Sequence, residues 1–227
     1  MKSMTIPSKV ACELITWERS AQLSRTLAKK VIESGYSPDL VIAIARGGFV
    51  PARIVCDHLL LNDLTSIKVE HWGIATRKSE KARIKYPLSM DISGKKVLVV
   101  DDVTDTGETM ALILDYLRSL SPLETRIGVL HHKACSQFVP DYIAEVQPEW
   151  RWIVYPWAIY EDLAGFSSKI ISEGALDRKD LESALFDRYC MRVGREVLED
   201  VIALLIMIGE VKEENGLLLH SHSLSIR

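Results

Sequence analysis

Runs rich in apolar and β-branched residues recur along the first part of the chain. Residues 39–45 (DLVIAIA) form one such run, which is too apolar to alternate between a buried and an exposed face. A run of this kind is typical of a strand that is buried on both faces, as in a parallel sheet. Similar composition predicts further strands over 66–72 (SIKVEHW), 95–102 (KKVLVVDD) and 125–133 (TRIGVLHHK).

Helical patterns lie before and between these runs. Over 14–35, apolar residues such as Leu23 and Leu27 recur at helical spacing, and the pattern ends at a glycine. Residues 46–60 turn through two glycines into a second predicted helix, and 111–120 (ALILDYLRSL) predict a third. Alternating strands and helices predict an α/β fold with a doubly wound, mostly parallel sheet.

The last part of the chain has a different pattern. Residues 177–189 and 194–210 predict two amphipathic helices, and 211–220 (VKEENGLLLH) predict a hairpin with Asn-Gly at its turn. We therefore expect a main domain over 1–167 and a small helical, winged-helix-like domain over 168–227. The small domain has eight Lys or Arg and eleven Asp or Glu, which accounts for the net charge of −3. Because a module that reads DNA needs a basic stripe, a role in dimerisation or as a lid is favoured over nucleic-acid binding.

Composition narrows the class of protein further. Apolar residues make up 48% of the chain and charged residues 26%, which is typical of a folded globular protein. The isoelectric point near 6.1 gives no global field that would attract nucleic acid or membrane. The longest apolar run, 201–208, is too short to span a bilayer. Four dispersed cysteines without a CxxC pair indicate a reducing, cytoplasmic compartment.

Two adjacent carboxylates end the third predicted strand. Asp101 and Asp102 lie where ligands bind in open α/β sheets, beyond the carboxyl end of a strand. The segment TDTGET (104–109) follows and leads into a helix, so its amides and hydroxyls can bind a phosphate. Carboxylates repel a simple anion, but they accept hydrogen bonds from hydroxyl groups beside a phosphate. This combination predicts a site for a ribose 5-phosphate.

These residues resemble a known family. VLVVDDVTDTGETM (97–110) resembles the 5-phosphoribosyl 1-pyrophosphate (PRPP) motif of type I phosphoribosyltransferases, and IAIARGGFVPARIV (42–55) resembles their pyrophosphate loop. LITW, LHHKA and WIVYPW occur in the same order as in the bacterial xanthine-guanine phosphoribosyltransferases. The resemblance covers about 14–166. It implies a homodimer or higher homo-oligomer that uses Mg²⁺.

The resemblance implies roles for the residues around the acidic pair. Asp101 and Asp102 would hold the ribose hydroxyls and help to position Mg²⁺. Asp105 would face N7 of the purine and assist proton movement. Where the family usually has glycine or lysine, this chain has Glu108, whose carboxylate should point away from the phosphate. The residues expected to bind the 5-phosphate are Thr104, Asp105, Thr106, Gly107, Glu108 and Thr109.

Two further groups of roles follow from the resemblance. Arg46 and Gly47 would bind pyrophosphate, with a cis peptide bond between Ala45 and Arg46, and Arg46 and Asp105 are the residues expected to act in catalysis. Lys133 would donate to O6 of a 6-oxopurine. Trp152 would stack on the base, and the backbone of Ile153 would meet its exocyclic edge.

The segment 76–85 is basic and lacks a hydrophobic period. By itself it reads as a solvated loop. In the family this position belongs to a flexible loop that closes over the reaction centre and excludes water. Which of its basic residues contacts pyrophosphate stays open. The candidates are Arg77, Lys78, Lys81 and Arg83.

The resulting hypothesis is a purine salvage glycosyltransferase. Its partners would be PRPP and a purine base, with no membrane and no nucleic acid. Lys133 favours guanine, hypoxanthine or xanthine, because an ammonium group donates to a carbonyl oxygen and repels the amino group of adenine. Two alternatives stay open: an adenine phosphoribosyltransferase, and a transcriptional regulator that senses PRPP without catalysis.

Overall fold

The computed structural model describes residues 8–72 and 81–221 of the 227-residue chain. It divides into two compact units, an N-terminal unit of residues 17–150 and a C-terminal unit formed by 8–16 together with 151–221. The sequence placed the domain boundary at residue 167. In the structure this residue lies inside the helix α4 (Ile159–Ile171), so the predicted boundary does not coincide with the division into units.

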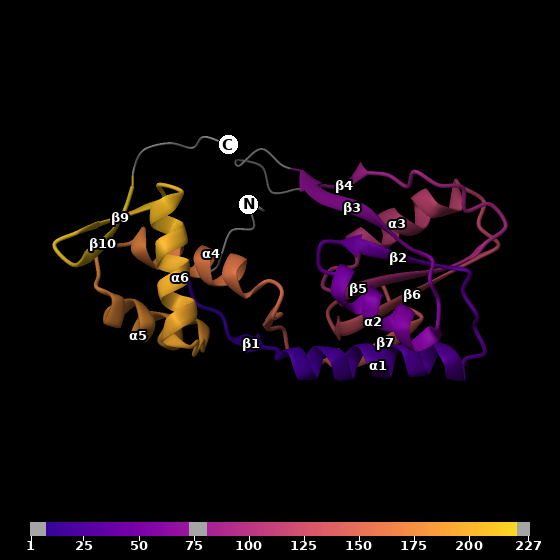
Figure 1. Cartoon of the computed structure of the whole chain (residues 1–227), viewed down its shortest axis with the longest axis horizontal. Coiled ribbons are helices and arrows are strands. Elements are labelled where there is room, and N and C mark those ends of the chain that lie inside the picture. The colour runs from indigo at the N-terminus through magenta and orange to yellow at the C-terminus, as the bar shows by residue number, and fades with distance from the viewer. Residues whose placement is uncertain (1–7, 73–80, 222–227) are drawn as a thin grey trace. The chain divides into compact units, whose positions relative to one another are not determined.

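A six-stranded sheet forms the centre of the N-terminal unit (Figure 1). The strands follow the order β4-β3-β2-β5-β6-β7, and all neighbours are parallel except β3 and β4. The predicted doubly wound, mostly parallel sheet is therefore confirmed. The strands are β2 (Leu40–Ala45), β3 (Leu64–Trp72), β4 (Lys81–Tyr86), β5 (Lys96–Thr104), β6 (Glu124–Lys133) and β7 (Tyr142–Gln147).

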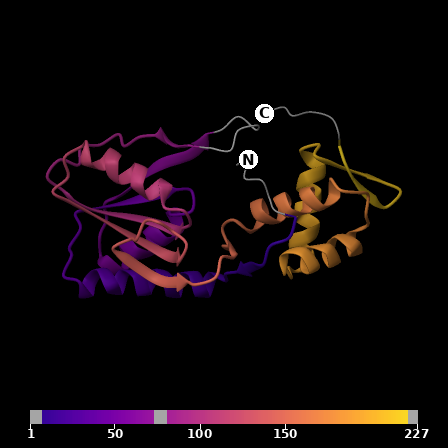
Figure 2. The ribbon, with the colours of Figure 1, turned by 180° about the vertical axis from the view of Figure 1, so that it is seen from behind.

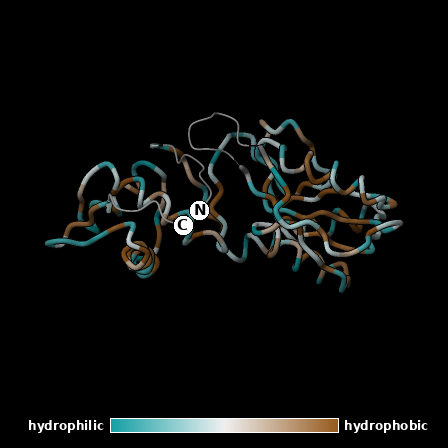
Figure 3. The backbone as a smooth tube through the Cα atoms, turned by 90° about the horizontal axis from the view of Figure 1, so that it is seen from above, coloured by the Kyte–Doolittle hydropathy of each residue, from teal (hydrophilic) through white to brown (hydrophobic). Residues whose placement is uncertain are grey.

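Helices cover both faces of this sheet (Figures 1 and 2). The helices α1 (Trp17–Glu33) and α2 (Phe49–Leu59) lie on one face, and α3 (Glu108–Arg118) lies on the other. On the α3 side, Met110 and Ile113 are buried in one cluster with apolar side chains of the central strands. Figure 3 shows hydrophobic segments running through the interior of this unit, as a sheet covered on both faces requires.

Strand β4 corrects the prediction of a loop for residues 81–85, whereas residues 76–80 lie outside the described residues. Its residues pair antiparallel with β3, and Arg83 lies in register with Glu70. Ala82 and Ile84 are half-buried against the core while Arg83 and Lys85 are exposed, so the strand has the two-residue period of a half-buried edge. The prediction was wrong for these residues because two apolar positions among three basic ones are too few to show a period.

The C-terminal unit contains the predicted helix, helix and hairpin. Asn215 and Gly216 both have positive φ, the conformation that a two-residue hairpin turn requires. Leu176 forms an antiparallel bridge to Leu218, which adds a third extended segment beside the hairpin. Identification of this unit as a winged helix stays a prediction. The predicted helices are α5 (Arg178–Tyr189) and α6 (Arg195–Met207), and the hairpin is β9 (Val211–Glu214) and β10 (Leu217–His220). The unit also contains α4 and the strands β1 (Cys12–Leu14) and β8 (Trp152–Val154).

An aromatic cluster fills the core of the C-terminal unit. The Phe166 ring lies 4.3 Å from the ring of Tyr189 and 5.6 Å from that of Trp152, which it meets edge-on. Phe166 and Tyr189 belong to one buried apolar cluster, and the partly buried Trp152 packs against it. Among the described residues, no helix has both the length and the apolarity that crossing a bilayer requires.

Candidate active site

The acidic pair lies at the carboxyl end of β5, a central strand of the sheet. Asp101 is buried, and its Oδ1 accepts a hydrogen bond of 2.9 Å from the backbone amide of Asp102. Asp102 is half-buried. Thr104, at the end of the strand, is buried, and its Oγ1 has no hydrogen-bond partner among the described residues. The strand therefore presents two carboxylates at the edge where α/β sheets bind ligands.

The loop after β5 turns sharply into α3. Gly107 has a φ of 91°, and a Cβ at this position would overlap the Cβ of Phe138 and lie 2.9 Å from its amide nitrogen. Only glycine fits this turn. The first turn of α3 starts at Glu108 and presents amides that the helix itself leaves unbonded, together with the positive end of its dipole. Thr106 is exposed beside it, as is the Glu108 side chain, whereas Thr109 is half-buried.

The glycine turn after β2 lies against the acidic pair. A Cβ at Gly47 would overlap the carboxylate of Asp102, and a Cβ at Gly48 would lie 2.8 Å from the carbonyl oxygen of Ile44. The peptide bond between Ala45 and Arg46 is cis, which confirms that prediction. Because β2 and β5 are neighbours in the sheet, the two predicted anion-binding loops meet at one edge.

Lys133 ends β6, the strand next to β5. Its side chain is buried, with 4% of the residue exposed, and Nζ lies 3.1 Å from Oδ2 of Asp105. Burying the ammonium group of Lys133 costs desolvation energy, and solvent weakens its attraction to Asp105, whose side chain is 37% exposed. The pair is therefore better explained by what it can bind than by a gain in stability.

Trp150 completes this group, and the sequence analysis missed it. Its Nε1 donates a hydrogen bond of 3.1 Å to Oδ1 of Asp105, and Nζ of Lys133 lies 4.3 Å from the centre of its ring. The available signal was the pair of tryptophans in EWRW (149–152). The resemblance drew attention to the second of them alone.

Comparison with known proteins now identifies the family. Residues 12–162 match the model of the phosphoribosyl transferase domain. The chain belongs to this family. Over 158 residues it is 28% identical to the xanthine-guanine phosphoribosyltransferase of Idiomarina loihiensis, an alignment that covers 68% of this chain and 94% of the relative.

Two solved structures resemble the transferase domain. A purine phosphoribosyltransferase from Pyrococcus horikoshii superposes with a TM-score of 0.58 at 33% identity, over 64% of this chain and 93% of the other. A protein from Neisseria gonorrhoeae solved with bound ppGpp superposes with a TM-score of 0.59 at 27% identity, over 65% of this chain and 89% of the other. The residues outside the matched range include α5, α6 and the hairpin.

Two residues predicted to bind the purine lie in the C-terminal unit. The indole N–H of Trp152 donates to Oδ1 of Asp162 at 3.2 Å, and its ring packs edge-on against Phe166. Ile153 is buried in β8. The group of Asp105, Lys133 and Trp150 belongs to the N-terminal unit, so the roles of Trp152 and Ile153 at the base stay predictions.

The basic segment of the transferase domain is described only in part. Arg77 and Lys78 fall outside the described residues. Lys81 is the first residue of β4, and Arg83 is exposed on the same strand. Their contacts with pyrophosphate stay predictions.

The acidic pair suits Mg²⁺. This ion prefers oxygen ligands and is commonly held by one or two carboxylates together with substrate phosphates. Asp101 and Asp102 supply such carboxylates, beside the glycine turn that approaches Asp102. In the part of the chain that the structure describes, no group of three or more His, Cys, Asp or Glu residues gathers for a metal.

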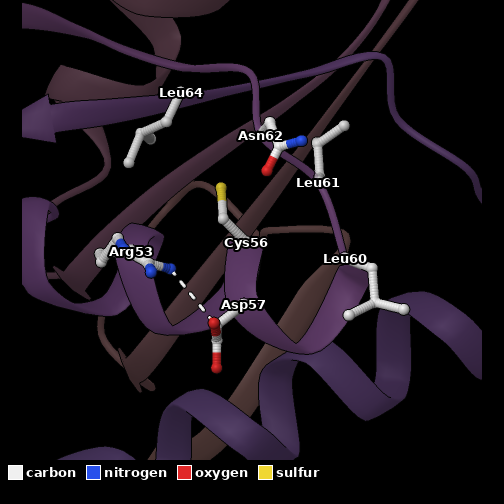
Figure 4. A pocket seen from close by; sticks show the side chains of 7 residues that line it. All are labelled: Arg53, Cys56, Asp57, Leu60, Leu61, Asn62 and Leu64. Carbon is white, nitrogen blue, oxygen red and sulfur yellow. Dashed lines mark ion pairs between the residues drawn. The ribbon is translucent and has the colours of Figure 1, made fainter.

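A separate pocket lies near the amino end of β3, away from the carboxyl ends of the strands (Figure 4). It is lined by the C-terminal part of α2 and the segment that enters β3 at Leu64. Substrates of open α/β sheets bind at the carboxyl ends of the strands, and this pocket lies at the amino end of β3. Cys56, which lines it, is no reactive thiol, because burial raises its pKa to about 11.

Proposed function

We propose that this protein is a purine phosphoribosyltransferase that transfers the 5-phosphoribosyl group of PRPP to N9 of a 6-oxopurine. One observation carries the proposal most directly. Lys133, the proposed donor to the base, contacts Asp105. Asp105 begins the loop that is proposed to bind the phosphate. A base and a sugar phosphate bound to these two neighbours would meet at the carboxyl edge of the sheet.

The choice of base follows from the chemistry of Lys133. An ammonium group has three donors and no acceptor, so it pairs with the carbonyl oxygen of a 6-oxopurine and opposes the amino group of adenine. Because Lys133 is buried, an amino group in place of the carbonyl oxygen would leave one of its N–H donors without an acceptor, which strengthens the discrimination.

The sugar and its phosphate would occupy the segment from Asp101 to Thr109. The carboxylates of Asp101 and Asp102 would accept hydrogen bonds from the two ribose hydroxyls. The amides at the start of α3, with the hydroxyls of Thr106 and Thr109, would bind the 5-phosphate. Arg46 and the backbone of Gly47 would bind the pyrophosphate.

In the proposed reaction, N9 of the base attacks C1 of the ribose and the bond from C1 to the pyrophosphate oxygen breaks. The transition state resembles an oxocarbenium ion, so positioning and electrostatics supply most of the acceleration. Asp105 accepts the proton that the base loses through N7. Mg²⁺, when bound at the acidic pair, would offset the charge of the pyrophosphate.

The relatives support this choice. The Idiomarina loihiensis protein is named a xanthine-guanine phosphoribosyltransferase and the Pyrococcus horikoshii protein a purine phosphoribosyltransferase. The Neisseria gonorrhoeae structure holds ppGpp, a guanine nucleotide. We also propose a cytoplasmic, homo-oligomeric enzyme. Cys12, Cys56, Cys135 and Cys190 are all free thiols, which suits a reducing compartment.

The test supplies the purified protein with PRPP, Mg²⁺ and one base at a time, and measures nucleotide and pyrophosphate. We expect product from at least one of guanine, hypoxanthine and xanthine, and little from adenine. Lys133→Met, which keeps the length of the side chain without its charge, should lower kcat/KM for the oxopurine by roughly 10²-fold, in line with losing a charged hydrogen bond of about 3 kcal/mol. Preferential use of adenine would contradict the choice of base. Binding of PRPP without product from any base would favour the regulator.

A further inference from the structure

A side chain of the protein itself occupies the place that the proposed function assigns to the purine. Trp150 contacts both residues predicted to read the base, because its indole N–H donates to Asp105 and its ring faces Lys133. We propose that Trp150 is an internal competitor of the purine, which fills the base site of the free enzyme and must leave before a base can bind. The inference rests on the proposed function.

The indole has the chemistry needed for this role. Like a purine, it is a six-membered ring fused to a five-membered ring, and its N–H lies on the five-membered ring. A purine that carries its proton on N7 presents the same kind of donor and leaves N9 free to attack. The bond of 3.1 Å from Nε1 to Oδ1 of Asp105 thus takes the place of the bond expected from the substrate.

Lys133 shows what the indole cannot supply. An indole has no acceptor in its ring plane, so the ammonium group lies 4.3 Å from the ring centre in a cation–π contact. A 6-oxopurine brings a carbonyl oxygen, and a hydrogen bond from a buried ammonium to this oxygen is stronger than the contact that it replaces. The correct base can therefore displace the indole.

Exposure indicates which group has to move. Lys133 is 4% exposed and ends a strand of the sheet, so it is held in place. Trp150 is 44% exposed and lies in the segment between β7 and β8, outside any helix or strand. A base reaches Lys133 only after Trp150 has left, and Trp150 can leave without disturbing the sheet.

Competition of this kind has a defined thermodynamic signature. If only a fraction of the protein has its base site open, the apparent affinity of every ligand that needs the site falls by that fraction. Ligands that occupy only the sugar-phosphate part are unaffected. Removing the indole should therefore improve the binding of a mononucleotide and leave that of its ribose 5-phosphate part unchanged.

The experiment measures binding by calorimetry with three ligands, namely guanosine 5-monophosphate, inosine 5-monophosphate and ribose 5-phosphate. It compares the unmodified protein with Trp150→Ala and Trp150→Phe, whose phenyl ring keeps the cation–π contact but lacks the N–H. Phe186→Ala is the matched control, because Phe186 is also exposed and contacts a cation, Arg192 at 4.3 Å, but lies in the other unit.

We expect Trp150→Ala to tighten binding of both nucleotides by about tenfold, the scale of one hydrogen bond to a charged group, and by the same factor for each. Trp150→Phe should give a smaller gain, and ribose 5-phosphate should bind all variants equally. Weaker nucleotide binding by Trp150→Ala would overturn the inference and make Trp150 a platform that stacks on the base. Unchanged binding would overturn it too.

The outcome separates this inference from the proposed function. Binding does not require turnover, so a tenfold gain in a protein that makes no nucleotide from any base would support the competitor and reject the transferase. Nucleotide synthesis by the unmodified protein, without tighter nucleotide binding by the variants, would support the transferase and reject the competitor. Thermal unfolding of each variant identifies loss of the fold. If Trp150→Ala unfolds, Trp150→Phe, which retains more side-chain volume, can be used for the binding measurement instead.

Discussion

At the scale of single residues, the site depends on glycines that let two loops approach the end of β5. A Cβ at Gly47 would overlap the carboxylate of Asp102, and a Cβ at Gly107 would overlap the side chain of Phe138. Both glycines lie in segments proposed to bind phosphate groups. Close packing of backbone at these points positions the acidic pair and the amides together.

Substitution of Gly47 tests this packing. We expect Gly47→Ala to displace Asp102 or the turn and to lower kcat/KM for PRPP by about 10²-fold, since displacements near 1 Å have effects of this size. Gly174→Ala is the matched control, because nothing lies within 4 Å of its Cβ position, and it should leave activity unchanged. Equal activity of the two variants would show that the turn does not position Asp102.

His132 gives the protein a residue-scale dependence on pH. Burial lowers its pKa below the ordinary value of about 6.5, so the folded state prefers the neutral ring. As the pH falls through about 6.5, the unfolded chain takes up the proton first, and the free energy of unfolding decreases until the folded pKa is reached. Through one titrating group, the free energy of unfolding cannot change by more than about 1.4 kcal/mol per pH unit.

Urea unfolding at several pH values from 7.5 to 5.5 measures this effect. His132→Gln should lose part of the dependence on pH, while His58→Gln, which changes an exposed histidine of α2, should retain it. Identical pH profiles for the unmodified protein and His132→Gln would exclude the predicted linkage.

Residues were predictable where a local pattern carried the information. The acidic pair and the glycine turn followed from short motifs, and the cis bond at Arg46 followed from the family that those motifs resemble. Trp150 did not, because its contacts with Asp105 and Lys133 join segments that are distant along the chain. No local pattern distinguishes such a tryptophan from one in a core.

At the scale of elements, strands with long apolar runs were predictable and short edge strands were not. β2 and β5 are central, buried strands whose long apolar runs predict a strand clearly. β4 and β7 form the two edges of the sheet, where one side of the strand lacks a neighbour and polar residues are tolerated. β1 and β8 pair with each other and have three residues each, which is too short to show a period.

Phe166 tests the packing of α4 in the C-terminal unit. It is fully buried between the rings of Trp152 and Tyr189, so Phe166→Ala should lower the free energy of unfolding of this unit by about 3–5 kcal/mol. Phe186→Ala, at a position 43% exposed on α5, should cost less than about 1 kcal/mol. Chemical denaturation followed by circular dichroism measures both, and similar losses would show that the aromatic cluster does not hold the unit together.

At the scale of the whole molecule, a transferase domain is followed by a unit whose charge opposes nucleic-acid binding. Between 168 and 227, acidic residues outnumber basic ones by eleven to eight. The exposed part of α6 adds apolar side chains, Leu204 and Met207 among them, and its first turn carries Glu196. A helix that reads DNA needs the opposite charge.

We therefore expect the full chain to show no retention of duplex DNA in an electrophoretic shift assay at about 50 mM salt, where phosphate contacts are strongest. A protein with a basic DNA-binding domain serves as the positive control. A shift that weakens steeply as salt increases would contradict this expectation and support the regulator.

The division of the chain into compact units was the least predictable feature. The boundary expected at residue 167 followed from a change in sequence character, whereas β8 and α4 pack with the C-terminal elements. Long-range contacts of this kind, such as the pairing of Cys12 with Trp152 in β1 and β8, leave no local signal.

The most direct test of the account is a crystal structure with Mg²⁺ and guanosine 5-monophosphate. The account predicts that the 5-phosphate lies in the loop from Asp105 to Thr109, that both ribose hydroxyls donate to Asp101 and Asp102, and that O6 of the base accepts from Lys133. A nucleotide bound elsewhere on the molecule, with this loop vacant in a well-resolved map, would contradict it.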